Sequence, residues 1–370
     1  AAWRGHEKRA PTPLYIKYTA TLGNKDVVRV KTALRMGKRQ LAHFGSPSGR
    51  CYNAPMLWSR AFGSSRARSR LCLQGDAMSL TSLALLLSLG AVWGASFLCI
   101  KIGVTDLSPF TFAALRVLIG ALVLLAVIAL RRQPWPREAR IHRHLAFMGF
   151  VGITIPFAAI AWGTQYIASG LSAILNATMP LFTFVLVVLL GDGDLSGRRA
   201  LGLFVGFLGI VVLTWPKLQA GIRSELFGQL AIIMASLSYA IAIIYARRHL
   251  THQPPLVTAV GQVAMGFLFF APLALAEAPW QQTFTARALG AASIVGAIGT
   301  GLAYIIYYRL VRDIGPTGTS LVTYIVPLFG IVWGWAILRE ALSWHAFAAL
   351  GLILVGLILV NGPPRWRRSP

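Results

Sequence analysis

Arg116 is the residue of this sequence with the clearest potential for chemistry, because its permanent charge lies inside a long apolar run. It stands seven residues after Pro109, where that run begins, which is roughly 10 Å along a helix that rises about 1.5 Å per residue. A guanidinium at that depth in a membrane has to face protein, water or a bound anion. Arg116 is therefore a candidate for binding a solute anion and, equally, for bonding helix-end carbonyls.

Eight other polar or aromatic residues are predicted to lie at comparable depth and to line a solute cavity with Arg116. They are Trp93, Trp162, Gln165, Asn176, Tyr239, Gln262, Tyr304 and Tyr324. Helix packing, or an aromatic belt at the membrane surface, is the alternative for the aromatic members. Pro180 and Pro327 are candidate hinges, because proline removes a backbone hydrogen bond and frees a carbonyl; simple kinks are the alternative.

Enzymatic signatures are absent from the sequence. It contains no GxxxxGK[ST] loop, no HExxH and no GxSxG, so a P-loop motor and these hydrolase classes are not predicted. The run 191–194 lacks the further oxygen ligands of a calcium loop and is predicted to be a turn. Cys51, Cys72 and Cys99 show no spacing typical of a metal or redox site. We expect no catalytic residues, no metal and no cofactor.

The composition predicts a membrane protein. Hydrophobic residues make up 56% and charged residues 12%, with a mean hydropathy of +0.64, whereas soluble domains carry about 25% charged residues. Roughly 20 apolar residues cross a bilayer as a helix. We predict an all-α integral membrane protein with ten spans, at 80–100, 109–130, 145–166, 170–190, 199–215, 226–246, 256–276, 288–308, 317–338 and 343–361.

The spans are predicted to form a duplicated unit. Pro180-Leu181-Phe182 returns 147 residues later as Pro327-Leu328-Phe329, and a shift of 146 brings Arg116 onto Gln262. Each copy holds five spans, an odd number, so the second copy must enter the membrane from the opposite side. Two inverted five-helix repeats are the architecture of secondary transporters.

The basic residues predict the orientation. If the first span starts in the cytoplasm, 14 Lys and Arg residues lie on the cytoplasmic side and five lie outside. Cytoplasmic loops are the basic ones, so both ends of the membrane domain are predicted to be cytoplasmic in a multi-pass protein of the cell (inner) membrane.

Four segments are predicted: a basic extension (1–77), two five-helix repeats (78–216 and 217–362) and a cytoplasmic tail (363–370). The extension carries 15 basic and three acidic residues. We favour the interpretation that residues 1–77 are upstream sequence that is disordered or not native to the working protein, with Met78 as the natural start. A transit peptide is the main alternative, and we expect no nucleic-acid partner because no binding motif is visible.

The membrane part resembles the EamA type of the drug/metabolite transporter superfamily. The residues that carry the resemblance are Trp93-Gly94 and Phe97 in the first span, Arg116 after Pro-Phe in the second, and the small-residue–Pro–apolar pattern of the fourth and ninth spans. Arg339-Glu340-Ala341-Leu342 matches the acidic residue that follows in the family. The first copy departs from that pattern, with Gly193 at the position of Glu340. The resemblance implies carrier-mediated movement of small solutes, often export, without a nucleotide-driven motor.

We therefore predict a secondary transporter that moves small, amino-acid-like metabolites across the inner or plasma membrane by alternating access, with export the expected direction. A multidrug-type exporter of hydrophobic compounds is the alternative. The predicted partners are a small-molecule solute and the lipid bilayer. A proton gradient is one possible energy source, and the sequence is compatible with a monomer and with a homodimer. Gly202, Gly206 and Gly209 are predicted to form a face for close helix packing, within one chain or in a dimer.

Overall fold

The computed structural model describes residues 14–22, 26–34, 52–53, 70–71, 79–191, 195–219, 221 and 223–361. Contacts divide the chain into two compact units, residues 1–75 and 76–370. The predicted turn at 191–194, apart from Gly191, and the predicted tail at 363–370 lie outside the described residues.

The first unit contains two short antiparallel pairs of strands. Strands β1 (Leu14–Leu22) and β2 (Asp26–Leu34) pair with Leu14 opposite Leu34 and Leu22 opposite Asp26. Strands β3 (Tyr52–Asn53) and β4 (Arg70–Leu71) form the other pair. The predicted all-α character therefore applies to the second unit. That residues 1–77 are not part of the working protein stays a prediction.

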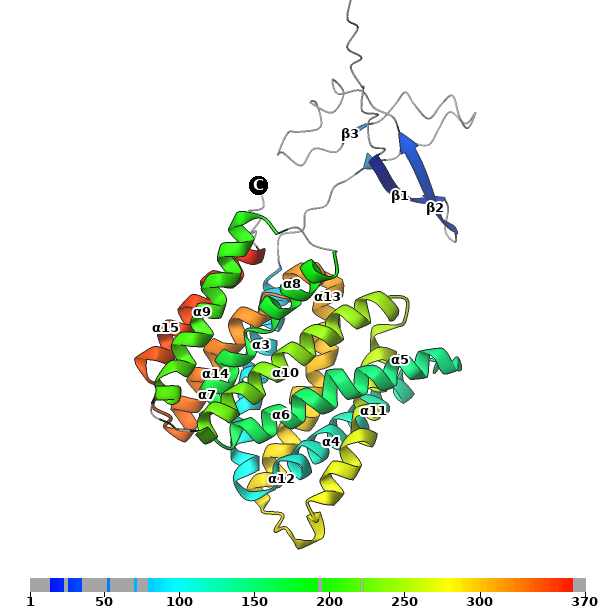
Figure 1. The fold of residues 1–370 in the computed structure, drawn as a ribbon. Helices are drawn as coiled ribbons and strands as arrows, with labels where there is room; N and C mark the ends of the chain where they lie inside the picture. The colour runs from blue at the N-terminus through cyan, green and yellow to red at the C-terminus, as the bar shows by residue number, and fades with distance from the viewer. Residues whose placement is uncertain are drawn as a thin grey trace, which may run out of the picture. The chain divides into compact units, whose positions relative to one another are not determined.

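The second unit is helical in the parts that the structure describes. Its elements are α3 (Leu80–Asp106), α4 (Pro109–Leu130), α5 (Ala139–Gly149), η2 (Phe150–Thr154), α6 (Ile155–Thr164), α7 (Ser169–Asn176), α8 (Met179–Leu189), α9 (Gly197–Gln219), α10 (Arg223–His249), α11 (Pro255–Ala276), η3 (Pro279–Gln281), α12 (Ala286–Ser293), η4 (Ile294–Leu302), α13 (Ala303–Thr319), α14 (Val322–Leu338) and α15 (Trp344–Asn361) (Figure 1).

Eight helical stretches of the described chain are long and apolar enough to cross a membrane. Two shorter apolar helices, Val322–Leu338 and Trp344–Val360, follow them. The predicted separation of the spans 145–166 and 170–190 is present, because α6 ends at Thr164 and α7 begins at Ser169. The helical membrane fold is confirmed, while ten spans in two inverted repeats stay a prediction.

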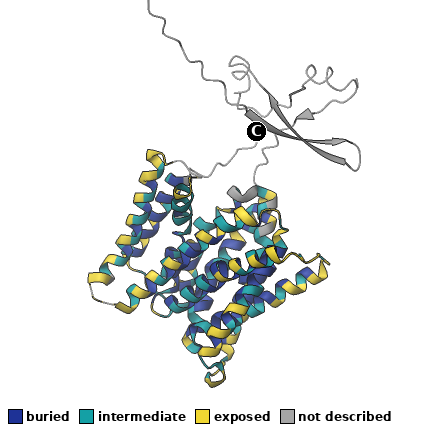
Figure 2. Ribbon diagram, turned by 45° about the vertical axis from the view of Figure 1, so that its right-hand side comes forward, coloured by how far each residue is buried: buried dark blue, intermediate teal, exposed yellow. Residues whose placement is uncertain are grey.

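The surface of the helical unit is apolar over wide areas, as expected of a bundle that faces lipid. Helix α9 exposes Phe204 by 66% and Val211 by 50%, whereas Phe112 and Phe270 in the interior are fully buried. Figure 2 shows buried residues inside the bundle and exposed ones along its outer faces. Exposed apolar side chains on this scale indicate a surface that lies against lipid or another protein.

Helix α9 packs along α15, its counterpart in the predicted repeat, and Figure 1 draws the two side by side. A Cβ atom added at Gly356 would lie 2.6 Å from the Gly202 carbonyl oxygen and 2.7 Å from the Gly206 Cα. Glycine at these positions lets the two backbones touch. The predicted glycine face therefore serves packing within the chain.

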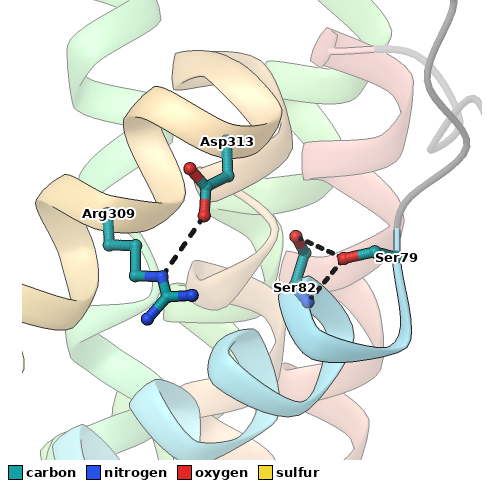
Figure 3. Close-up of polar contacts among 4 residues, drawn as sticks. All are labelled: Ser79, Ser82, Arg309 and Asp313. Carbon is teal, nitrogen blue, oxygen red and sulfur yellow. Dashed lines mark hydrogen bonds and ion pairs between the residues drawn. The ribbon is translucent and has the colours of Figure 1, made fainter.

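The helix ends and breaks have local causes. Ser79 caps α3, since its Oγ accepts a hydrogen bond from the Ser82 N–H at 3.1 Å, and Arg309 pairs with Asp313 one turn further along α13 at 3.4 Å (Figure 3). The segments η2 and η4 are π-helical and interrupt two otherwise α-helical spans. Such π-helical turns occur frequently at functional sites.

We expect Gly356→Ala to lower the thermal stability of the detergent-solubilised protein, because the new methyl group forces α9 and α15 apart. Overpacking of this kind costs about 1–3 kcal/mol. The matched control is Gly351→Ala on the same helix, where an added Cβ meets no atom within 4 Å. Equal melting temperatures for the two variants would contradict the close contact.

Candidate functional site

Arg116 lies on α4 with only 8% of its surface exposed. Its Nε donates a hydrogen bond to the Thr300 hydroxyl at 3.3 Å. Its guanidinium carbon lies 3.9 Å from the centre of the Phe157 ring. A cation over an aromatic face is attracted by the negative electrostatic potential of the ring, and more strongly where water is excluded.

Two tyrosines from the second half of the chain lie close to the same cation. Tyr239 on α10 and Tyr304 on α13 lie within electrostatic range of Arg116. Tyr239 packs edge-on against Phe157 at 6.5 Å between ring centres. The Gln262 side chain on α11 donates a hydrogen bond to the Tyr304 hydroxyl at 3.1 Å. We call Arg116, Phe157, Tyr239, Gln262, Thr300 and Tyr304 the arginine site.

The arginine site contains no counter-charge among the described residues. No described carboxylate lies within ion-pair distance of Arg116, and four of the five groups around the cation are aromatic rings or hydroxyls. A buried charge without a paired charge is costly, so it is usually paired or binds something. The arrangement can therefore hold an anion against an aromatic wall.

The π-helical segments shape this site. Thr300 lies in η4, and its hydroxyl donates to the Val295 carbonyl at 3.1 Å while it accepts from Arg116. Thr154, which is 146 residues earlier, ends η2 and donates in the same way to the Gly149 carbonyl at 3.0 Å. Both bonds span five residues, which is the spacing of a π-helical turn, and add a side-chain donor to its carbonyls.

Trp93 lies beside the arginine site without joining it, and Tyr324 is not among the residues that make up that site. The Trp93 indole N–H donates to the Gly299 carbonyl at 3.2 Å, so Trp93 contacts the residue next to Thr300. Its ring also packs against Tyr307 at 5.8 Å. Tyr324 is partly buried against the main core. Trp93 thus packs against η4, and Tyr324 belongs to the core around the helices.

Asn176 is the last residue of the short helix α7. The end of α7 contacts α10 about one turn before Tyr239 of the arginine site. Ser236 donates towards the Leu175 carbonyl at 3.3 Å and lies three residues before Tyr239. The side-chain oxygen of Asn176 is buried and has no hydrogen-bond partner within the described chain. Pro180 occupies the first turn of the separate helix α8, whereas Pro327 lies inside continuous α14. The two candidate hinges thus differ in local structure.

Trp162 and Gln165 lie away from the arginine site. Trp162 packs against Tyr166 at 5.0 Å between ring centres. Gln165 follows the last residue of α6, and its backbone carbonyl accepts a hydrogen bond from Lys101 at 3.0 Å. Both residues lie beside the link between α6 and α7, and not over the cation.

Phe157 and Thr300 belong to the site although the sequence analysis did not single them out. Phe157 is one of many apolar residues in its span, and no sequence signal marks it. Thr300 stands between Gly299 and Gly301 and shares its residue type with Thr154 in the first copy. This repeated threonine is the signal that was available. Among the described residues, no group of three metal-binding side chains occurs.

The chain matches the model of the EamA-like transporter family twice, over residues 80–215 and 226–362. It belongs to this family. The EamA resemblance inferred from the sequence is thereby confirmed, and each match falls on one predicted half.

Curated relatives agree with this family. The chain is 23% identical over 281 residues to "Uncharacterized transporter YoaV" of Bacillus subtilis, covering 74% of this chain and 94% of the relative. It is 25% identical over 279 residues to "Uncharacterized inner membrane transporter YedA" of Escherichia coli, covering 75% and 89%. A crystal structure shares the fold with a TM-score of 0.53 and 18% identity, over 76% of this chain and 98% of the other. This EamA chain is therefore a multi-pass membrane transporter.

We expect Thr300→Val to destabilise the protein by about 1–3 kcal/mol, because the isosteric side chain leaves the Arg116 Nε–H buried without an acceptor. The matched control is Thr214→Val on α9, whose hydroxyl bonds only within its own helix. Thermal unfolding of both variants in detergent is the measurement. A Thr300→Val protein as stable as Thr214→Val would show that the Arg116–Thr300 bond contributes little.

Proposed function

We propose that this transporter carries small amino-acid-like metabolites and that Arg116 binds their carboxylate. The observation that supports this most is a buried guanidinium with no carboxylate partner in the described chain, faced by residues of both halves. A carboxylate accepts two parallel hydrogen bonds from a guanidinium, and such charge-assisted bonds are among the strongest in proteins.

The remainder of the arginine site suits the other parts of such a solute. Phe157 and Tyr239 offer ring surfaces, and Gln262 and the Tyr304 hydroxyl offer a donor and an acceptor. Tyrosine combines an apolar body with a polar tip, which fits a zwitterion with an organic side chain. A cationic substrate is disfavoured, because Arg116 would repel it.

Contacts between the halves support two inverted repeats that work by alternating access. Helix α4 of the first half packs on η4 of the second half, and α11 of the second half packs on η2 of the first half. Gly120 faces Thr300 in one contact, and Gly266 faces Ile153 in the other. The two glycines are 146 residues apart. A site built between two such halves is exposed to one side at a time when the halves rock.

A multidrug-type exporter of hydrophobic compounds is the second candidate. The observation in its favour is the number of aromatic rings near the cation, namely Trp93, Phe157, Tyr239, Tyr304 and Tyr307. Its substrates would not need Arg116. The two functions therefore differ in what the loss of that one charge does.

Amino-acid flux into proteoliposomes tests the proposal. We expect Arg116→Ala to reduce flux about tenfold or more, because a hydrogen bond to a charged group contributes about 1.5–3 kcal/mol. Asn176→Ala is expected to reduce flux less. Arg287→Ala, an exposed arginine at the start of α12, is the control. Unchanged flux in Arg116→Ala, together with drug resistance on overexpression, would favour the multidrug function.

Export is the proposed direction of transport. Thiol labelling tests the proposed orientation, in which both ends of the membrane domain are cytoplasmic. In a Cys51→Ser, Cys72→Ser, Cys99→Ser background, an impermeant reagent added to intact cells should label Trp280→Cys and not Pro134→Cys. Trp280 is 69% exposed in the link after α11, and Pro134 is exposed in the link after α4. The opposite pattern would reverse the orientation.

A further inference from the structure

We infer that Lys101, Glu277 and Glu340 are the gate residues that close one end of the transport path, an inference that rests on the proposed function. The distal end is the end of the bundle at which α3, α6, α11 and α14 finish and α4, α7, α12 and α15 begin. Each gate residue places a charge on a helix terminus of opposite polarity there.

Glu340 caps the start of α7. Its carboxylate accepts hydrogen bonds from the Ser169 N–H at 2.8 Å, the Ser169 hydroxyl at 2.9 Å and the Gly170 N–H at 3.1 Å. The backbone turns just before Glu340, since Arg339 at the end of α14 adopts a left-handed conformation with φ 55°. Gly334 leaves the necessary space, because a Cβ there would lie 2.8 Å from the Ser169 hydroxyl.

Lys101 binds the end of α6 on the other side of the same link. Its ammonium donates to the carbonyls of Thr164 at 2.8 Å, Gln165 at 3.0 Å and Ile167 at 3.0 Å. Carbonyls at a helix end carry partial negative charge, and free N–H groups at a helix start carry partial positive charge. The α6–α7 link is thus held by a cation from α3 and an anion from the segment after α14.

Glu277 makes the corresponding contact at the start of α4. It follows α11 and accepts from the Thr111 N–H at 2.7 Å and from the Thr111 hydroxyl at 2.9 Å. Gln282 adds a bond from the Ser108 N–H at 3.0 Å. In the predicted repeat, α11 corresponds to α4, as α14 corresponds to α7 and α8. Each carboxylate therefore follows one helix and caps the start of its counterpart.

These contacts decide which motion is possible. Glu277 and Glu340 belong to the second half of the chain, whereas the helix starts that they cap belong to the first. Opening the distal end by rocking the halves apart must break both caps. The structure is therefore a state closed at the distal end, and the strength of the caps sets how often it opens.

Gln229 opposes the closed state. It is fully buried on α10, and neither its side-chain oxygen nor its side-chain nitrogen has a hydrogen-bond partner within the described chain. Its neighbour Gly228 packs on the gated link, since a Cβ there would lie 2.9 Å from the Gly163 carbonyl oxygen and 3.1 Å from the Tyr166 Cβ. A buried amide without partners destabilises the state that contains it. Replacing it with an apolar side chain of similar size should favour closure.

The test measures accessibility of Cys99 to an impermeant thiol reagent, in a Cys51→Ser, Cys72→Ser background. Cys99 is 7% exposed, lies two residues before Lys101 and is within electrostatic range of Arg116. Reagent is applied separately to each membrane face, using cells and inverted vesicles. Glu277→Gln, Glu340→Gln and Gly334→Ala should each raise the labelling rate from one face, by about three- to thirtyfold per lost cap. Gln229→Met should lower it.

Glu138→Gln is the matched control, because Glu138 is exposed at the start of α5 and its side chain makes no capping bond. Labelling of all the gate variants at the Glu138→Gln rate from both faces would overturn the inference. Where a carboxylate variant does not fold, Gln229→Met decides: slower labelling with a higher melting temperature supports the gate, and unchanged labelling overturns it.

Labelling needs no substrate, so the gate and the solute assignment fail separately. Altered Cys99 labelling without amino-acid flux in the wild-type protein would remove the proposed substrate and keep the gate. Arg116-dependent flux with labelling unchanged in every gate variant would remove the gate and keep the substrate.

Discussion

The cost of keeping the Arg116 guanidinium inside a membrane protein governs the centre of this structure. The cation is accommodated by an aromatic ring at 3.9 Å and one hydroxyl at 3.3 Å, without a carboxylate among the described residues. Aromatic faces and hydroxyls stabilise a cation less than a paired carboxylate does, so capacity to bind an anion is left over. A fully paired Arg116 would stabilise the fold and leave nothing for a solute.

The surrounding backbone is arranged to serve that charge. In the π-helical segment η4, the Thr300 hydroxyl donates to the Val295 carbonyl and still accepts from Arg116. Thr154 in η2 makes the equivalent backbone bond but reaches the Gly266 carbonyl at 3.3 Å instead of a charged side chain. One structural device therefore occurs in both halves, and only one copy holds the cation. Each half matches the family model, and Arg116 stands where the other half has Gln262.

The sequence predicted the parts that depend on one segment at a time. Apolar length predicted the helical spans, because lipid requires backbone groups to be satisfied within each helix. Polar residues at depth predicted Arg116, Tyr239, Gln262 and Tyr304, which lie together, while their role in binding a solute stays a prediction. Phe157 was missed, because a ring becomes a cation partner only where two helices cross. Trp162 lies in the last turn of α6 and Gln165 follows its end at Thr164, two residues before the predicted end of the span. The side-chain contacts of both residues depend on the neighbouring helices, which residue spacing does not give.

Charges at helix ends matter in a chain with so few acidic residues. Of its 11 Asp and Glu residues, Glu277 and Glu340 each cap a helix of the other half. In lipid the hydrophobic effect does not draw helices together, so close packing and polar contacts hold them in place. Two carboxylates at one end add such polar contacts between the halves. In the inferred gate, the distal end therefore stays closed until the hydrogen bonds of Glu277 and Glu340 to the helix starts are both broken.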